Sequence, residues 1–262
     1  MLLGCLAVAF SHLAVPLTSF RRMHLKQGDP KPTIDPSRFT LIGHRFCPFV
    51  ERVRLTLHYH HIDFDTIFIA FTSKPDWFLD MYPTGKVPLL LTTDGKSLVE
   101  SDVIMRYVDQ LRGPNASLMS VCGEEQFSEA LDLCSKLAAI SYRITYGYAL
   151  KSDEHDFRQA LRALNDRIKG PYFTGPELSL ADLVILPHLN RVEATLAFAA
   201  GLESSKVTDF EQDDTRLADC PKLLAYILNL RQQSFVSEVR EPSQVLAKFA
   251  ATIRAGNPNP DL

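Results

Sequence analysis

The sequence predicts a small α/β domain followed by an all-helical domain, and two observations support this prediction. Short strand-like and helix-like segments alternate from residue 39 to residue 113. Only helical patterns follow residue 114, and the composition changes near residues 113–116. We therefore expect three regions: an N-terminal extension (1–38), an α/β domain (39–113) and an all-helical domain (114–262).

The first domain is expected to have the order β-α-β-α-β-β-α. Pro48 suits the first turn of a helix, where its missing N–H is no loss. Asp94-Gly95 predicts a hairpin between two short strands. Gly113-Pro114 stops the last helix. The strands are expected within residues 39–43, 63–70 and 87–100, and the helices from 48, over 75–82 and over 101–112.

Helical periodicity dominates the second domain. Ser179 and Asp182 have the spacing of a capping box, in which the two residues satisfy free N–H groups at a helix start. The expected helices cover residues 124–150, 154–169, 179–202, 220–233 and 241–256.

The composition is that of an ordinary globular protein. Of the 262 residues, 46% are hydrophobic and 23% are charged, which is enough for a core of normal size. The net charge is -3, and no run rich in lysine and arginine is present. We therefore exclude nucleic acid as a partner.

The cysteines favour a reducing compartment. Their number is odd, and no two have the C-x-x-C spacing, so neither a disulfide framework nor a zinc site is expected. We expect no metal and a cytoplasmic location. The five are Cys5, Cys47, Cys122, Cys134 and Cys220.

The N-terminal extension leaves two alternatives open. Residues 1–20 contain no charged side chain, and a segment of this length could span a bilayer or serve as a secretory signal. The early basic residue of a signal is missing, however, and Pro16 interrupts the run. We favour a disordered or processed extension, in which the proline-rich residues 26–38 do not pack.

Cys47 is the candidate reactive group. It stands between a strand-like run and a helix start, directly before Pro48. Free backbone N–H groups and the helix dipole stabilise a thiolate at such a position, so we expect a lowered pKa. The alternative is a buried, inert cysteine. Position 50 is Val50, so no resolving thiol follows, and an external thiol such as glutathione must release any mixed disulfide.

Three other segments could bind an extended tripeptide such as glutathione. A cis bond at Val87-Pro88 would turn the Val87 backbone outward, although an ordinary edge-strand proline is equally compatible. Glu100 could bind the ammonium group, and Ser101 is either a helix N-cap or a carboxylate ligand. Lys74 could bind the second carboxylate, or be a solvated loop lysine.

These motifs, in this order and spacing, resemble omega-class glutathione transferases. The resemblance covers residues 39 to about 230, so it spans both domains. It is carried by RFCPFVERVRL, KPDWFLDMYPTGKVPLL, LVESDVIMRYVDQL and SLADLVILPHLNRVEA.

The resemblance implies a thioredoxin-like domain, an all-helical domain and a homodimer. It implies glutathione-dependent thioltransferase and dehydroascorbate reductase activities, with weak conjugation of electrophiles and glutathione as cosubstrate. Cys47 would be the catalytic residue. The implied glutathione contacts are Cys47, Phe49, Lys74, Val87, Pro88, Glu100 and Ser101.

The second-substrate site departs from the family pattern. Trp77 is the only tryptophan, whereas the family often carries tryptophans in the stretch where Leu186 and His188 stand here. His188 and Arg191 are candidates for the electrophile site. A structural or solvated histidine and a surface arginine are the alternatives.

Two functions from other classes compete with the enzyme. The first is a membrane-inserting protein like the chloride intracellular channels, which share the two-domain plan and a Cys-Pro-Phe turn. The Glu100-Ser101 pair and the charged residues Glu51, Arg52 and Arg54 argue against it. The second is a carrier of hydrophobic ligands. Glutathione-dependent turnover distinguishes the three.

Overall fold

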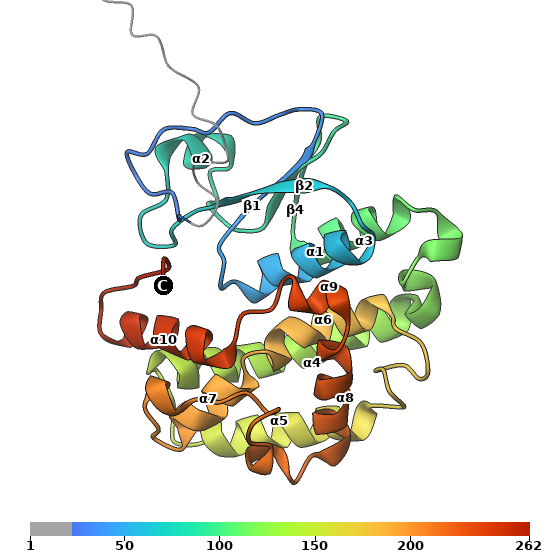
Figure 1. Ribbon diagram of the computed structural model, residues 1–262, viewed down its shortest axis with the longest axis vertical. Helices are drawn as coiled ribbons and strands as arrows, with labels where there is room; N and C mark the ends of the chain where they lie inside the picture. The colour runs from blue at the N-terminus through green and yellow to red at the C-terminus, as the bar shows by residue number, and fades with distance from the viewer. Residues whose placement is uncertain (1–22) are drawn as a thin grey trace, which may run out of the picture.

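A four-stranded sheet organises the first domain of the computed structural model, which describes residues 23–262 (Figure 1). Strand β1 pairs in parallel with β2, and the β1–β3 and β3–β4 pairs are antiparallel. The order in the sheet is β2-β1-β3-β4. The strands are β1 (Phe39–Gly43), β2 (Phe64–Phe68), β3 (Leu89–Leu91) and β4 (Ser97–Val99).

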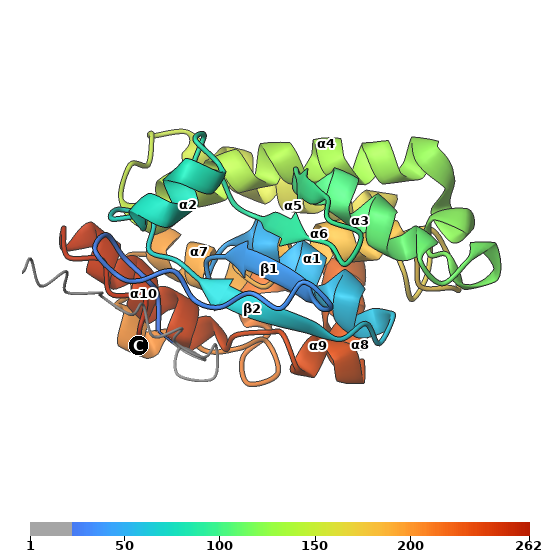
Figure 2. The same cartoon turned by 90° about the horizontal axis from the view of Figure 1, so that it is seen from above.

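Helices cover both faces of this sheet. Helices α1 (Pro48–Tyr59) and α3 (Ser101–Gln110) lie between the sheet and the second domain, whereas α2 (Asp76–Met81) lies on the opposite face (Figures 1 and 2). The alternation of the strands explains this division, because successive side chains point to opposite faces. Leu41 packs on the α1–α3 side, and its neighbour Ile42 packs on the α2 side.

The expected element order of this domain is confirmed, including the hairpin at Asp94-Gly95. The predicted lack of packing in residues 26–38 is wrong at two positions, because Pro32 is buried and Ile34 packs against the apolar cluster on the α2 face. Leu25, just before this stretch, is buried in the same cluster and forms a bridge with Ile69. The alternatives for residues 1–20 lie outside the described residues.

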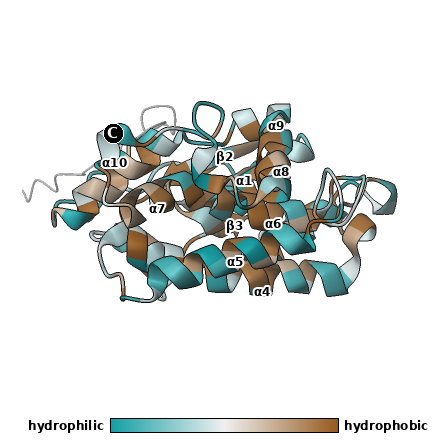
Figure 3. Cartoon of the chain, turned by 90° about the horizontal axis from the view of Figure 1, so that it is seen from below, coloured by the Kyte–Doolittle hydropathy of each residue, from teal (hydrophilic) through white to brown (hydrophobic). Residues whose placement is uncertain are grey.

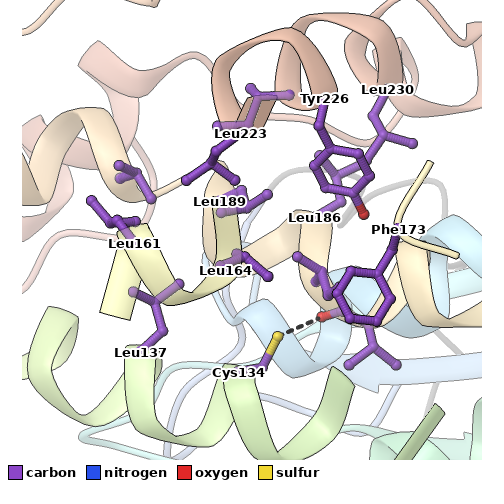
Figure 4. Close-up of a cluster of buried hydrophobic side chains, with 14 of the residues drawn as sticks. Cys134, Leu137, Leu161, Leu164, Phe173, Leu186, Leu189, Leu223, Tyr226 and Leu230 are labelled. Atoms are coloured by element: carbon purple, nitrogen blue, oxygen red, sulfur yellow. Dashed lines mark hydrogen bonds between the residues drawn. The ribbon is translucent and has the colours of Figure 1, made fainter. Parts of the chain in front are cut away.

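The second domain is helical throughout. Its core forms where α4, α5, α6 and α8 meet, and leucines from all four helices interdigitate there with Phe173 and Tyr226 (Figure 4). The helices are α4 (Met119–Tyr146), α5 (Asp153–Arg167), α6 (Leu180–Leu189), α7 (Val192–Ala199), α8 (Pro221–Arg231), α9 (Ser234–Ser237) and α10 (Ser243–Arg254). Single 3₁₀ turns lie at Pro114–Ala116, Ser204–Lys206 and Thr215–Leu217.

Helix α6 is the central helix of the domain. All of its residues are buried, whereas α4 and α5 carry both hydrophilic and hydrophobic residues (Figure 3). The capping box of Ser179 and Asp182 is confirmed. The single helix expected over 179–202 is wrong, because α6 ends at Leu189 and α7 begins at Val192, with a turn at Asn190 and Arg191 between them.

The two domains share a buried interface. Helix α1 packs on α6, and Leu55 of α1 belongs to the core of the second domain. The Arg45 guanidinium binds both carboxylate oxygens of Glu241, at 2.6 and 2.7 Å. His24 contacts Asp261 near the C-terminus, with 2.7 Å between Nδ1 and the carboxylate. The interface therefore fixes the start of α1 against the helical domain.

Among residues 23–262, no helix combines the length and the apolar character needed to cross a membrane.

Candidate active site

Cys47 lies at the junction that the sequence predicts. It is the N-cap of α1 with extended backbone angles, and Pro48 is the first helical residue. Its side chain is almost completely buried, with 6% of the residue exposed. Helix α1 begins directly after Cys47, since the Glu51 N–H donates to the Cys47 carbonyl at 3.0 Å.

A pocket of about 470 Å³ opens beside Cys47. Its walls come from the start of α1, the second half of α4, the α6–α7 junction and helix α10. Most of its lining is aromatic or aliphatic, which suits an apolar second substrate. The aromatic lining residues are Phe46, Phe49, Phe71, Tyr142, Tyr146 and Phe249.

Burial and the helix start act on the Cys47 thiol in opposite directions. Burial raises its pKa, because a thiolate is poorly solvated there. The backbone N–H groups of Val50 and Phe49 and the charge of Arg191 lower the pKa, but by less. The expected lowering of the Cys47 pKa is therefore wrong in its net sign. The helix start still favours the thiolate once it forms.

Arg191 contacts the site but does not offer a free charge. Its guanidinium donates to the Glu51 carboxylate at 2.7 Å and to the Phe46 carbonyl at 2.9 Å. It also contacts the carbonyl of Pro187. Its side chain is only 14% exposed, so the alternative of an exposed surface arginine is wrong. Glu51 occupies one of its nitrogens, and contact with an acidic substrate stays a prediction.

His188 lies on the same pocket wall and is neutral. Burial holds its pKa well below the usual range, and the neighbouring Arg52 and Arg191 lower it further. Its Nε2 lies 3.0 Å from an Arg52 nitrogen. Arginine is only a donor, so Nε2 accepts and the proton of the ring is on Nδ1. Phe49 meets the His188 ring edge-on, with 5.7 Å between the ring centres.

The segments proposed to bind the peptide of glutathione lie in the first domain. The Val87-Pro88 bond is cis, which resolves the alternative that the sequence left open. Val87 is half-buried and lies two residues before the start of β3. The Lys74 stem passes close to Gly85, whose positive φ of 62° permits this tight turn.

Glu100 and Ser101 occupy the start of α3. Glu100 is the N-cap, exposed and with a positive φ of 63°, so Ser101 is the first helical residue and its predicted N-cap role is wrong. Ser101 is buried, and its hydroxyl accepts from Arg52 at 3.4 Å.

The structure brings only some of the predicted residues together. Cys47, Phe49, His188 and Arg191 share the pocket, and Arg52 connects Ser101 to His188. The other predicted contacts do not line the pocket: Lys74, Val87, Pro88, Glu100 and Ser101. The sequence analysis missed Arg52, Glu51 and the aromatic wall. Tyr142 and Tyr146, spaced one helical turn apart, could have indicated that wall.

One group of acidic residues within the described part of the chain has a spacing compatible with a metal. Oxygens of Glu193, Asp209 and Glu211 lie within 4.8 Å of one another. Arg231 pairs with Glu193 and Glu211, and Arg240 pairs with Asp209. Arginine therefore already neutralises these carboxylates.

Comparison with known families agrees with this architecture. A model described as the glutathione S-transferase N-terminal domain matches residues 41–116, and one described as the glutathione S-transferase C-terminal domain matches residues 153–228. The chain belongs to the glutathione transferase family, with a thioredoxin-like first domain and a helical second domain.

Individual relatives and one solved structure show which members of the family this chain is similar to. Pyrimidodiazepine synthase of Drosophila melanogaster is 28% identical over 91% of this chain and 96% of its own length. Glutathione S-transferase DHAR2 of Arabidopsis thaliana is 32% identical over 57% and 68%, and glutathione S-transferase omega-1 of Sus scrofa is 30% identical over 57% and 65%. The structure of glutathione transferase Omega 1C from Trametes versicolor has a TM-score of 0.67 at 22% identity, covering 84% of this chain and 98% of that one. The resemblance to the omega class is thus confirmed.

Proposed function

We propose that the chain is a glutathione-dependent thioltransferase and dehydroascorbate reductase in which Cys47 forms a mixed disulfide with glutathione. The observation that carries the proposal is that Cys47 stands at a helix N-terminus on the wall of a pocket, with valine at the position of a resolving thiol. Cys220 also precedes a proline at a helix start, but it does not line this pocket. Relatives named as dehydroascorbate reductases and omega-class transferases support it.

The reaction divides into two exchanges. The Cys47 thiolate attacks the glutathione sulfur of a mixed disulfide, a new S–S bond forms, and the substrate thiolate leaves and takes a proton. A second glutathione thiolate then attacks the glutathione sulfur on Cys47. Oxidised glutathione leaves, and the Cys47 thiolate is restored. With dehydroascorbate, the two electrons come from two glutathione molecules.

The chain's own residues support these steps in distinct ways. The N–H groups of Phe49 and Val50 stabilise the thiolate that attacks and later leaves. The buried pocket wall excludes water from the sulfur. We assign Phe49, Lys74, Val87, Pro88, Glu100 and Ser101 to glutathione, with Glu100 taking the ammonium group. The aromatic pocket takes the second substrate, a small disulfide or an electrophile. Conjugation is weak, and the chain acts as a homodimer.

The test compares Cys47→Ser with Cys122→Ser. Cys122 is also a buried free thiol, but it does not line the pocket, so it controls for the loss of a buried sulfur. Reduction of hydroxyethyl disulfide and dehydroascorbate should collapse only in Cys47→Ser, while glutathione still binds. Conjugation of a chlorodinitrobenzene-type electrophile is expected to persist or rise, since a serine hydroxyl can donate to glutathione's own thiolate. Reductase activity retained in Cys47→Ser would contradict the proposal.

A further inference from the structure

Arg52 is a buried cation at the centre of the interface between the domains. It stands on α1, five residues after Cys47, and only 4% of it is exposed. Its Nε donates to the Val184 carbonyl of α6 at 3.1 Å. One Nη donates to the Ser101 hydroxyl at 3.4 Å, and the other donates to His188 Nε2 at 3.0 Å.

Among the residues that the structure describes, no carboxylate forms an ion pair with this guanidinium, although the more distant charge of Asp102 acts against the effect of burial on its pKa. Within residues 23–262, no Asp or Glu oxygen lies within 4.0 Å of its nitrogens. Glu51, the neighbouring acid, is occupied by Arg191 and by the Asn190 amide, each at 2.7 Å. Burial accordingly lowers the pKa of Arg52. A buried charge without a counter-ion is costly, so a ligand anion that approaches it gains stabilisation.

The hydrogen bond to Ser101 links this charge to the start of α3. Arginine has only donors, so the Ser101 hydroxyl must accept from Arg52. The hydroxyl therefore keeps its own proton free to donate to an acceptor outside the protein. Ser101 is also the first residue of the ten-residue helix α3, whose free N–H groups favour an anion at the same point.

We propose that Arg52 is a positioning residue that binds the α-carboxylate of glutathione's γ-glutamyl end through the Ser101 hydroxyl. The proposal rests on the proposed function in taking glutathione as the ligand. The same guanidinium holds His188 and lies 5.1 Å from the centre of the Phe49 ring. It thereby connects the γ-glutamyl site with the wall of the second-substrate pocket.

The test measures binding, without turnover, by calorimetry on the full chain under a phosphine reductant. Two ligands are compared: glutathione, and γ-aminobutyryl-cysteinyl-glycine, which lacks only the α-carboxylate. The proteins are the wild type, Arg52→Gln, Arg52→Lys and, as a control, Arg54→Met. Arg54 stands on the same helix but contacts Val239 and Phe68 instead.

The ratio of the two dissociation constants isolates the role of the charge. We expect Arg52→Gln to reduce the wild-type preference for glutathione about tenfold, or about 1.4 kcal/mol. Arg52→Lys and Arg54→Met should retain most of that preference. A purely structural Arg52 would weaken both ligands equally, and an unchanged ratio in Arg52→Gln would overturn the proposal. An equal fall of the ratio in Arg52→Gln and Arg52→Lys would also overturn the role of charge.

A substitute variant and the activity of the wild type cover the remaining outcomes of this test. If Arg52→Gln does not fold, Ser101→Ala replaces it, and an unchanged ratio in that variant overturns the proposal. If the wild type lacks thioltransferase activity but the ratio changes as expected, the proposed function fails and this inference stands. Absence of glutathione binding to the wild type would overturn both.

Discussion

Removing Arg191 should destabilise the start of α1, where Cys47 stands. In the Arg191→Met variant, the buried Glu51 carboxylate keeps the Asn190 amide but loses its cationic partner, and the Phe46 carbonyl loses a donor. Breaking one side of a buried ion pair typically lowers the free energy of unfolding by 3–5 kcal/mol. Because Asn190 remains, we expect about 3 kcal/mol, which corresponds to a fall of roughly 6–12 °C in Tm.

A double-mutant cycle tests the reason for this loss. In Arg191→Met/Glu51→Gln, neither charge of this pair is left buried without its partner, so the loss should be smaller than the sum of the two single losses by about 2 kcal/mol. The assay is thermal and urea unfolding followed by circular dichroism, with each variant measured in the same buffer. Additive losses, or a loss below about 1 kcal/mol in Arg191→Met, would refute a stabilising pair between Arg191 and Glu51.

Three further predictions concern the peptide site, the helical core and the thiol. Glu100→Ala removes the proposed acceptor for the ammonium group of glutathione, so KM for glutathione should rise roughly tenfold; an unchanged KM in the folded variant speaks against the assignment. Asp182 accepts hydrogen bonds from Phe173, Ser179 and Tyr226, so Asp182→Ala should lower the unfolding free energy by about 4 kcal/mol and Tyr226→Phe by only about 1 kcal/mol; equal losses would show that the shared acceptor is not the cause. Because burial raises the Cys47 pKa, its alkylation rate by iodoacetamide should still rise above about pH 9.5, where a free cysteine of pKa about 8.5 levels off; a plateau near neutral pH would contradict the net sign.

Features specified by local sequence were predictable. The hairpin at Asp94-Gly95 and the capping box of Ser179 and Asp182 each depend on residues only a few positions apart. The position of Cys47 before Pro48 likewise follows from a strand end and a helix start. Such short-range signals yielded the element order and the location of the candidate nucleophile.

Features set by distant contacts were not predictable in the same way. Arg191 was expected at the surface or at a substrate, but its partner Glu51 is 140 residues earlier in the chain. Arg52 contacts Val184 and His188, more than 130 residues later, and nothing near it in the sequence indicates this. The Cys47 pKa depends on the burial that these contacts create, so its net sign could not be derived from the helix start alone.

The covalent role of Cys47 is tested most directly by intact-mass spectrometry after incubation with oxidised glutathione, followed by peptide mapping. We predict one glutathionyl adduct on Cys47, which disappears when reduced glutathione is added, because a second thiolate attacks the mixed disulfide. Cys47→Ser should form no adduct at that position. An adduct confined to Cys122, Cys134 or Cys220, with Cys47 unmodified, would contradict the mechanism and return Cys47 to a structural role.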